Sequence, residues 1–259
     1  MGVVKSGENK AMTIRYKITA AFSALVLIAL GALVRSTNVS AAGEGKITGT
    51  VKFTGTPPHE RPIDMSKEPY CQKLHASNPV KTENVVVGPD GSLEWVVLYI
   101  SEGLSGSAAS AVSSEKPKWD QKGCQYIPHV MALDANQHFL VTNSDPTSHN
   151  IHPLPKAGGG NNQWNKSQPP GAPPIDTSWP GEEVAIQVKC NIHPWMHGYM
   201  AVVKGPNAVT DEKGAYTISG VPPGSYTVTA WQETLGTQTQ KVTVAAGKPA
   251  TADFTFKGK

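Results

Sequence analysis

Short alternations of apolar and polar residues run through the chain from residue 45 onward, and turn residues separate them. Residues 46–53 alternate strictly, which predicts a half-buried strand. Residues 83–87 lead into Gly88-Pro89-Asp90-Gly91 and the apolar run 93–100, a pattern that predicts a hairpin. No amphipathic helical stretch of useful length follows residue 41, so the pattern predicts an all-β fold.

The middle of the chain repeats this pattern. Apolar strands are expected at residues 139–142, 183–189 and 198–203. Residues 103–118, which are rich in Ser, Ala and Gly, have little to bury and are predicted to form a flexible boundary between two domains.

The last segment, residues 209–256, places short strands around Asp211-Glu212-Lys213-Gly214 and Pro222-Pro223-Gly224. It resembles the carboxypeptidase regulatory-like domain, a small transthyretin-like β-sandwich. Members of that family open with strands like residues 45–51 and 95–100, which here lie at the other end of the chain. The resemblance implies a discontinuous regulatory-like β-sandwich, residues 44–104 and 206–257, with a second domain at 118–205 inserted between its halves.

The first residues have the order of a secretory signal. Residues 18–34 are a run of 17 uncharged, mostly apolar residues, which basic residues precede and the small residues 39–42 follow. We expect residues 1–41 to be a signal peptide and the protein to be periplasmic or extracellular. The alternative is an uncleaved membrane anchor, because a run of this length reaches the lower limit for spanning a bilayer.

Composition and charge narrow the classes of function. The chain has 259 residues, of which 39% are apolar and 17% charged, so it has room for one large or two modest domains. The net charge is +3, but residues 1–41 hold five basic groups and one acidic group, which leaves about −1 for the remainder. A surface without excess positive charge argues against binding to nucleic acid.

The chain has three cysteines, so one must stay unpaired within the chain. Cys190 has neighbours typical of a metal site, and this leaves Cys71 and Cys124 either to form a disulfide or to stay free. We expect the disulfide between Cys71 and Cys124, although the sequence alone does not exclude a bond from either residue to Cys190.

One short loop carries the candidate chemistry. Cys190-Asn191-Ile192-His193-Pro194-Trp195-Met196 offers a thiolate, an imidazole and a thioether directly after the strand 183–189. A second imidazole, His149, follows the strand 139–142. Two imidazoles and a thiolate with a weak axial thioether are the ligands of a blue copper centre.

Both motifs resemble those of amicyanin and, more loosely, plastocyanin, which are cupredoxins. The resemblance lies in His149-Asn150-Ile151-His152 and in the Cys-x-x-His-Pro-aromatic-Met loop. It implies a cupredoxin-like Greek-key β-sandwich that holds one type 1 copper through His149, Cys190, His193 and Met196. Residues 155–181 depart from the family pattern. The rival interpretations are a buried thiol beside a surface histidine, and a zinc site, although zinc rarely uses Met.

The remaining candidates are assigned structural or surface roles. His152 points to the opposite strand face from His149, His197 lies at the rim of the loop, and Met200 fits a buried strand position. No partner can be named for His129.

A site with four protein ligands has no vacant position for substrate, so the expected function is electron transfer by an exported blue copper protein rather than catalysis. We expect a redox protein to dock near Pro194 and Trp195, where the edge of the His193 ring should approach the surface. Trp195 has a second interpretation, in which it packs against the adjoining sandwich. The alternative functions are an extracellular carbohydrate- or protein-binding module with a copper-holding or vestigial site, and a copper oxidoreductase in which Met196 does not bind.

Overall fold

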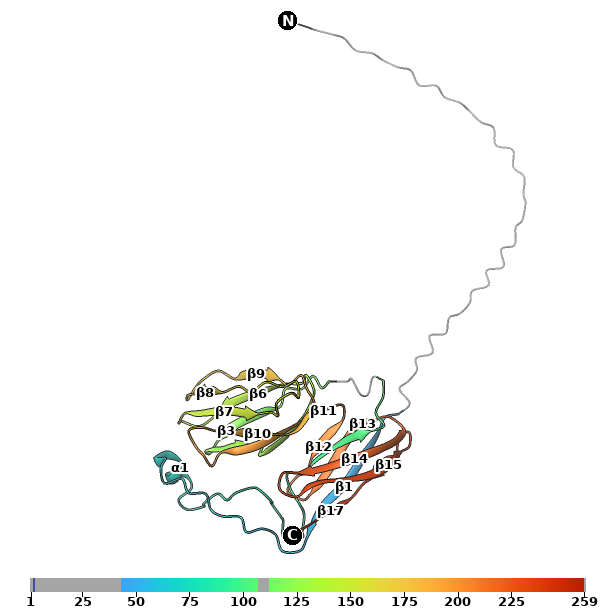
Figure 1. Ribbon diagram of the computed structural model, residues 1–259, viewed down its shortest axis with the longest axis horizontal. Helices are drawn as coiled ribbons and strands as arrows, with labels where there is room; N and C mark the ends of the chain where they lie inside the picture. The colour runs from blue at the N-terminus through green and yellow to red at the C-terminus, as the bar shows by residue number, and fades with distance from the viewer. Residues whose placement is uncertain (1, 3–42, 107–111, 259) are drawn as a thin grey trace, which may run out of the picture. The chain divides into compact units, whose positions relative to one another are not determined.

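The computed structural model describes residues 2, 43–106 and 112–258, and its folded part lies within one compact unit, Val39–Lys259. In the described residues the strands form four sheets, which pack as two β-sandwiches (Figure 1). The predicted all-β fold is confirmed, with one short helix in addition.

The first sandwich combines strands from both ends of this unit. One sheet has the order β13-β1-β16, with β17 also paired to β1, and the other has the order β12-β2-β14-β15. Their bounds are β1 Gly45–Thr54, β2 Val97–Glu102, β12 Asn207–Val209, β13 Ala215–Val221, β14 Gly224–Gln232, β15 Gly236–Val244, β16 Pro249–Thr251 and β17 Phe254–Lys257. Figure 1 shows the blue strand β1 among the orange and red C-terminal strands.

The alternation predicted for residues 46–53 explains how β1 joins this core. Ile47 and Val51 point to the same face and are fully buried in a cluster that also contains Leu98 of β2 and Val228 of β14. β1 runs antiparallel to β13 but parallel to β16 and β17. The first strand therefore depends on partners that lie more than 150 residues further along the chain.

The second sandwich is built from the intervening residues. Its five-stranded sheet has the order β5-β11-β10-β7-β8 and its four-stranded sheet the order β4-β3-β6-β9. The bounds are β3 Lys118–Lys122, β4 Gln125–Ile127, β5 Val130–Asp134, β6 His138–Asn143, β7 His149–Leu154, β8 Lys166–Gln168, β9 Ile175–Ser178, β10 Glu183–Lys189 and β11 His197–Val203. Trp119, Phe139 and Ile186 are fully buried in the core between the two sheets.

Residues 55–96 leave the first sandwich after β1 and reach the second one before β2. This segment contains the helix α1, Pro69–Leu74, and Cys71 of the helix forms a disulfide with Cys124, with the two Cα atoms 5.9 Å apart. The structure thus has the cysteine pairing expected from the sequence, and Cys190 is a free, buried thiol. Met65 packs with the disulfide in a small apolar cluster.

The predicted hairpin at residues 83–100 forms only next to its turn. The Gly91 N–H donates to the Gly88 carbonyl oxygen at 2.9 Å, and the arms are joined by the antiparallel bridge between Val87 and Leu93 and by the bond from the Glu94 N–H to the Val86 carbonyl oxygen at 3.1 Å. β2 instead pairs with β12 and β14. A strand with an apolar face is better buried inside a sheet of several strands than in an isolated hairpin.

The pairing of β1 and β2 with strands beyond residue 206 is what a discontinuous sandwich requires, while the proposed domain boundaries stay a prediction. The predicted signal peptide, residues 1–41, lies outside the described residues except for Gly2. Across the part of the chain that the structure describes, no helix has the length and apolar character needed to span a membrane.

Candidate metal centre

His149 opens β7, and the loop before it is held by its own polar side chains. The Asp145 N–H donates to Asn143 Oδ1 at 3.0 Å, and the Asn143 side chain donates to the Thr147 carbonyl oxygen at 2.8 Å. Asp145 Oδ1 and Oδ2 in turn accept the N–H groups of Gly123 and Cys124 at 2.7 and 2.8 Å. These bonds fix where β7 begins and therefore where His149 lies.

The second part of the site is the loop that joins β10 to β11. The Cys190 N–H donates to the Met196 carbonyl oxygen at 3.1 Å, and the Met196 N–H donates to the His193 carbonyl oxygen at 2.9 Å. The His193 N–H donates to Cys190 Sγ at 3.3 Å. The loop is therefore closed on itself, with Cys190, His193 and Met196 in fixed positions.

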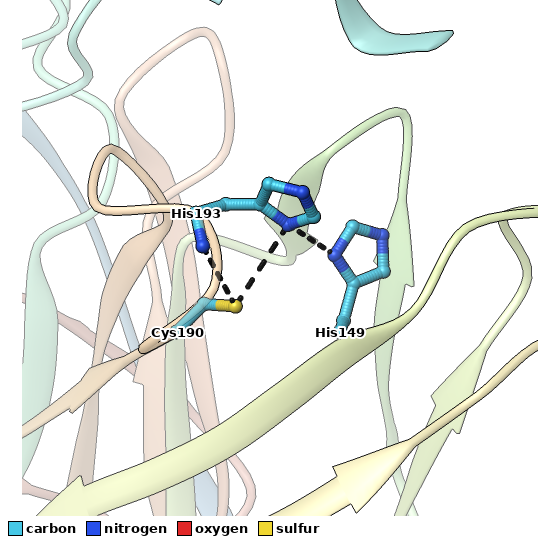
Figure 2. A group of neighbouring side chains, drawn as sticks. All are labelled: His149, Cys190 and His193. Atoms are coloured by element: carbon cyan, nitrogen blue, oxygen red, sulfur yellow. Dashed lines mark hydrogen bonds between the residues drawn. The ribbon is translucent and has the colours of Figure 1, made fainter. Parts of the chain in front are cut away.

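The two parts bring three candidate ligand atoms together (Figure 2). His149 Nδ1 lies 2.8 Å from His193 Nδ1, which lies 3.9 Å from Cys190 Sγ. All three ligand atoms lie within 4.8 Å of one another, and all three residues are buried. The sequence separation of 44 residues between the two histidines is closed by the pairing of β7 with β10.

A carboxylate lies behind each ring, and behind His149 it makes a hydrogen bond. His149 Nε2 lies 2.8 Å from Asp145 Oδ2, and a carboxylate only accepts, so Nε2 carries a proton and Nδ1 is the nitrogen that faces the site. His193 Nε2 is buried and lies 3.5 Å from Glu68 Oε2, from the segment before α1. A carboxylate behind an imidazole is the usual way in which proteins orient a histidine ligand.

The surroundings of Cys190 favour its thiolate form. Burial raises the pKa of the thiol, but the hydrogen bonds from His149 and from backbone N–H groups, including that of His193, outweigh it, and the net pKa lies below the ordinary value. The thiolate is the form that binds metals. Asn150 Oδ1 accepts from Asn191 N at 2.7 Å and so ties the loop to β7.

The electrostatics of the two rings differ. Burial lowers the pKa of His149, but the hydrogen bond to Asp145 and the contact with Cys190 more than offset this, and its pKa is raised. The pKa of His193 is lowered, first by burial and then by the neighbouring His149. A neutral imidazole is the ligand form, so the lowered pKa keeps His193 ready to bind.

Met196 lies on the same loop as Cys190 and His193. Its side chain is fully buried in the core cluster that holds Cys190, and its backbone closes the loop. Two imidazole nitrogens, one sulfur prone to ionise and a buried thioether on the same loop form a donor set that fits copper. The assignment of His149, Cys190, His193 and Met196 as ligands stays a prediction.

The structure differs from the expectation that the His193 ring edge approaches the surface. His193 is only 2% exposed, because Glu68 and Trp195 flank it. Trp195 is half-buried, its ring centroid lies 5.0 Å from that of His193, and its Nε1 donates to the Cys124 carbonyl oxygen at 3.0 Å. Pro194 and Ile192 are the exposed apolar residues of the loop.

The other candidates divide into two kinds. His152 bonds to Asn191 and Gln163 at an exposed position, and Met200 is fully buried, where its sulfur accepts from Trp179 Nε1 at 3.2 Å. These positions agree with the predicted surface role of His152 and the predicted core role of Met200. His129 and His197 are different, because they form a second group with Glu233. Sequence reasoning missed this group, since His129 and Glu233 are 104 residues apart and no local motif joins them.

Residues 201–257 match the carboxypeptidase regulatory-like domain. This match confirms the resemblance predicted for residues 209–256, while comparison with curated protein sequences found no match.

Several solved structures are similar to part of the chain. The Cu-containing nitrite reductase from Thermus scotoductus SA-01 is 14% identical over 36% of this chain, which spans 24% of that enzyme's length, with a TM-score of 0.31. The purple cupredoxin from Nitrosopumilus maritimus is 19% identical, with 34% and 99% of the two chains covered and a TM-score of 0.28. The amicyanin from Paracoccus versutus is 16% identical, with 40% and 96% covered and a TM-score of 0.30. Scores this low carry no argument about ligands or activity.

Proposed function

We propose that the protein is an exported type 1 copper protein that carries single electrons between redox partners. The observation that supports the proposal most is the buried convergence of His149 Nδ1, His193 Nδ1 and Cys190 Sγ. Copper bound there would supply reversible one-electron transfer. Met196 is proposed as the weak axial ligand because it follows His193 on the same closed loop.

The residues around the ligands suit electron transfer rather than catalysis. Asp145 and Glu68 lie behind the two imidazoles, and Asn150 ties the loop to β7, so the ligand positions change little between two oxidation states. Four protein ligands leave no open position for a substrate, and the burial of the site excludes water. The proposed role is therefore that of a carrier and not of an enzyme.

Two observations support export. The predicted signal at residues 1–41 has the basic, apolar and small-residue order of a secretory signal. The disulfide between Cys71 and Cys124 is of the kind that forms and persists in oxidising compartments. We place the protein in the periplasm or outside the cell on this basis, with the regulatory-like sandwich as the part that engages a carbohydrate or a cell-surface partner.

The test is copper binding followed by visible spectroscopy. The purified chain should take up one Cu(II) and show an intense thiolate-to-copper band, because Cys190 binds as the thiolate. Cys190→Ser should remove the band, and His149→Gln should weaken or remove it. His138→Gln is the matched control, since His138 is an exposed histidine of the same sandwich that pairs with Asp176. A chain fully loaded with copper that lacked the band would refute the type 1 assignment.

A further inference from the structure

A second group of histidines and carboxylates lies apart from His149, Cys190 and His193. His129 Nε2 lies 2.8 Å from Glu233 Oε2, and His129 Nδ1 lies 3.8 Å from Glu83 Oε2. The His129 and His197 rings meet edge to face with their centroids 5.3 Å apart. One ligand atom from each of His129, His197 and Glu233 lies within 4.8 Å of the others.

The fold assembles this group from three parts of the chain. His129 comes just before β5, which pairs in parallel with β11, and the Tyr199 N–H donates to the His129 carbonyl oxygen at 3.0 Å. This close approach requires Gly198, because a Cβ there would lie 2.6 Å from that oxygen. His197 begins β11, Glu233 follows β14 of the first sandwich, and Glu83 belongs to the segment 55–96.

The residues of this group are partly or fully buried, so their net charge affects the stability of the fold. The side chains of His129 and Glu233 are 2% and 4% exposed, and that of Glu83 is 30% exposed. Two carboxylates next to one imidazolium leave a net negative charge in a place where unpaired charge is costly. A divalent cation bound to Glu233 and two neutral imidazoles would balance the charges of Glu233 and the nearby Glu83 and bring the net charge to zero.

Two further features concern the histidines. His129 and His197 border a cavity of about 10 Å³, close to the size needed for one water molecule, which Glu83 and Lys81 also line. His197 Nδ1 lies 3.0 Å from the Trp195 carbonyl oxygen, which only accepts, so Nδ1 carries a proton. A backbone carbonyl in this position is a common partner of a metal-binding histidine. His197 Nε2 faces the Asn84 side-chain amide at 3.3 Å, so this amide must turn aside for Nε2 to bind an ion.

We propose that His129, His197 and Glu233 form a second metal site for a divalent ion of the zinc class, with Glu83 as a neighbouring negative charge. Imidazole and carboxylate ligands without sulfur suit Zn(II), whereas the thiolate and thioether at Cys190 and Met196 suit copper. Because Glu233 belongs to one sandwich and the two histidines to the other, the ion would cross-link them. The site would serve to hold the two sandwiches together.

The experiment uses the full chain with Cys190→Ala, so that the proposed copper centre cannot account for the result. We expect this variant to bind one Zn(II) in equilibrium dialysis and to unfold at a higher temperature when zinc is present. Glu233→Gln and His197→Gln in this background should each weaken binding by at least about tenfold. The matched controls are Glu102→Gln and His138→Gln, which change exposed residues elsewhere and should leave zinc binding unchanged.

A second measurement covers the case in which a variant fails to fold. Co(II) added to the Cys190→Ala chain should give the absorption of a four-coordinate ion with nitrogen and oxygen ligands and without a thiolate charge-transfer band. Zinc that does not bind, zinc that binds equally to all variants, or Co(II) that stays six-coordinate would overturn the proposal. None of these outcomes depends on the copper band of the Cys190 centre, so the two proposals can fail separately.

Discussion

At the scale of single residues, Asp145 links the loop before β7 to the candidate copper centre. Its carboxylate accepts the N–H groups of Gly123 and Cys124 and faces His149 Nε2 and the Tyr70 hydroxyl, at distances from 2.7 to 3.4 Å. One side chain thus orients the candidate ligand His149 and joins it to the turn between β3 and β4, which carries Cys124 of the disulfide. An amide in its place would point an NH₂ group at one of these donors.

Asp145→Asn is therefore expected to weaken copper binding about 10- to 100-fold while the thiolate band remains. Competition with a chelator of known affinity measures the loss, and the visible spectrum checks the band. Asp176→Asn serves as the control, because Asp176 pairs with Lys116 and His138 at an exposed position of the same sandwich. Equal copper affinities of parent and Asp145→Asn would show that Asp145 does not orient the ligand.

The sequence predicts the candidate ligands but not the residues behind them, and the reason is distance along the chain. Cys190, His193 and Met196 stand in one loop with a recognisable spacing. Glu68 lies 125 positions from His193, in a segment without a motif of its own, and only the folded chain brings them together. The group around His129 escapes prediction for the same reason.

At the scale of elements, the segment 55–96 distinguishes this chain from a plain sandwich. It carries α1 to the candidate copper centre, where Glu68 approaches His193, and the disulfide to Cys124 holds it there. The strands were predictable because their alternation is local, whereas α1 has six residues and too short a pattern to detect. Contacts with both sandwiches decide the segment's path, since Cys71 packs with Cys124 of the second one and Val85 and Leu93 are buried in the core of the first.

Replacing Cys71 and Cys124 together with alanine should lower the free energy of unfolding by about 2 to 4 kcal/mol, because the cross-link restricts the unfolded chain. Denaturant titration of the variant and the parent measures the difference. Adding a reductant to the parent is the control and should reproduce most of the loss. A variant as stable as the parent would mean that packing alone holds the segment.

The loop 190–196 has two proposed roles, packing against the rest of the protein and docking of a redox partner. Trp195 is half-buried beside His193 and donates to the Cys124 carbonyl oxygen, so Trp195→Ala should lower the free energy of unfolding by about 1 to 3 kcal/mol.

Ile192 is 47% exposed, and Ile192→Lys should slow electron exchange with a soluble redox protein while leaving the copper band and thermal unfolding unchanged. Leu74→Lys is the matched control, since Leu74 has the same exposure on α1. Unchanged exchange in Ile192→Lys would remove this loop as the docking surface.

At the scale of the whole molecule, two sandwiches share one chain that leaves the first, builds the second and returns. Val97 and Trp231 of the first sandwich pack with Val130 and Ala201 of the second in a common apolar cluster. The discontinuity was foreseeable from the family resemblance of the C-terminal segment, which lacked its opening strands. The contacts between the sandwiches could not be predicted, because the residues that make them look like ordinary strand residues in the sequence.

A chain of residues 206–259 alone should fail to unfold cooperatively, because it lacks β1 and β2, which are interior strands of the two sheets. Without them β13 has no bond to β16, and β12 has none to β14. Thermal unfolding followed by circular dichroism tests this, with residues 43–259 as the control. A sharp transition in the short chain would contradict the split-sandwich model.

The parallel pairing of β1 with β17 has a consequence for the order of events during biosynthesis. β1 is made before the inserted sandwich and β17 after it, so this edge of β1 stays unpaired until the inserted sandwich has been made. The inserted sandwich is complete in sequence by β11 and has most of its contacts within itself. It is therefore free to form first, and its closing brings the two halves of the other sandwich near each other. The entropy cost of closing this long loop would otherwise slow the pairing of β1 with the strands beyond residue 206. Folding of the inserted sandwich removes most of that cost before the pairing step.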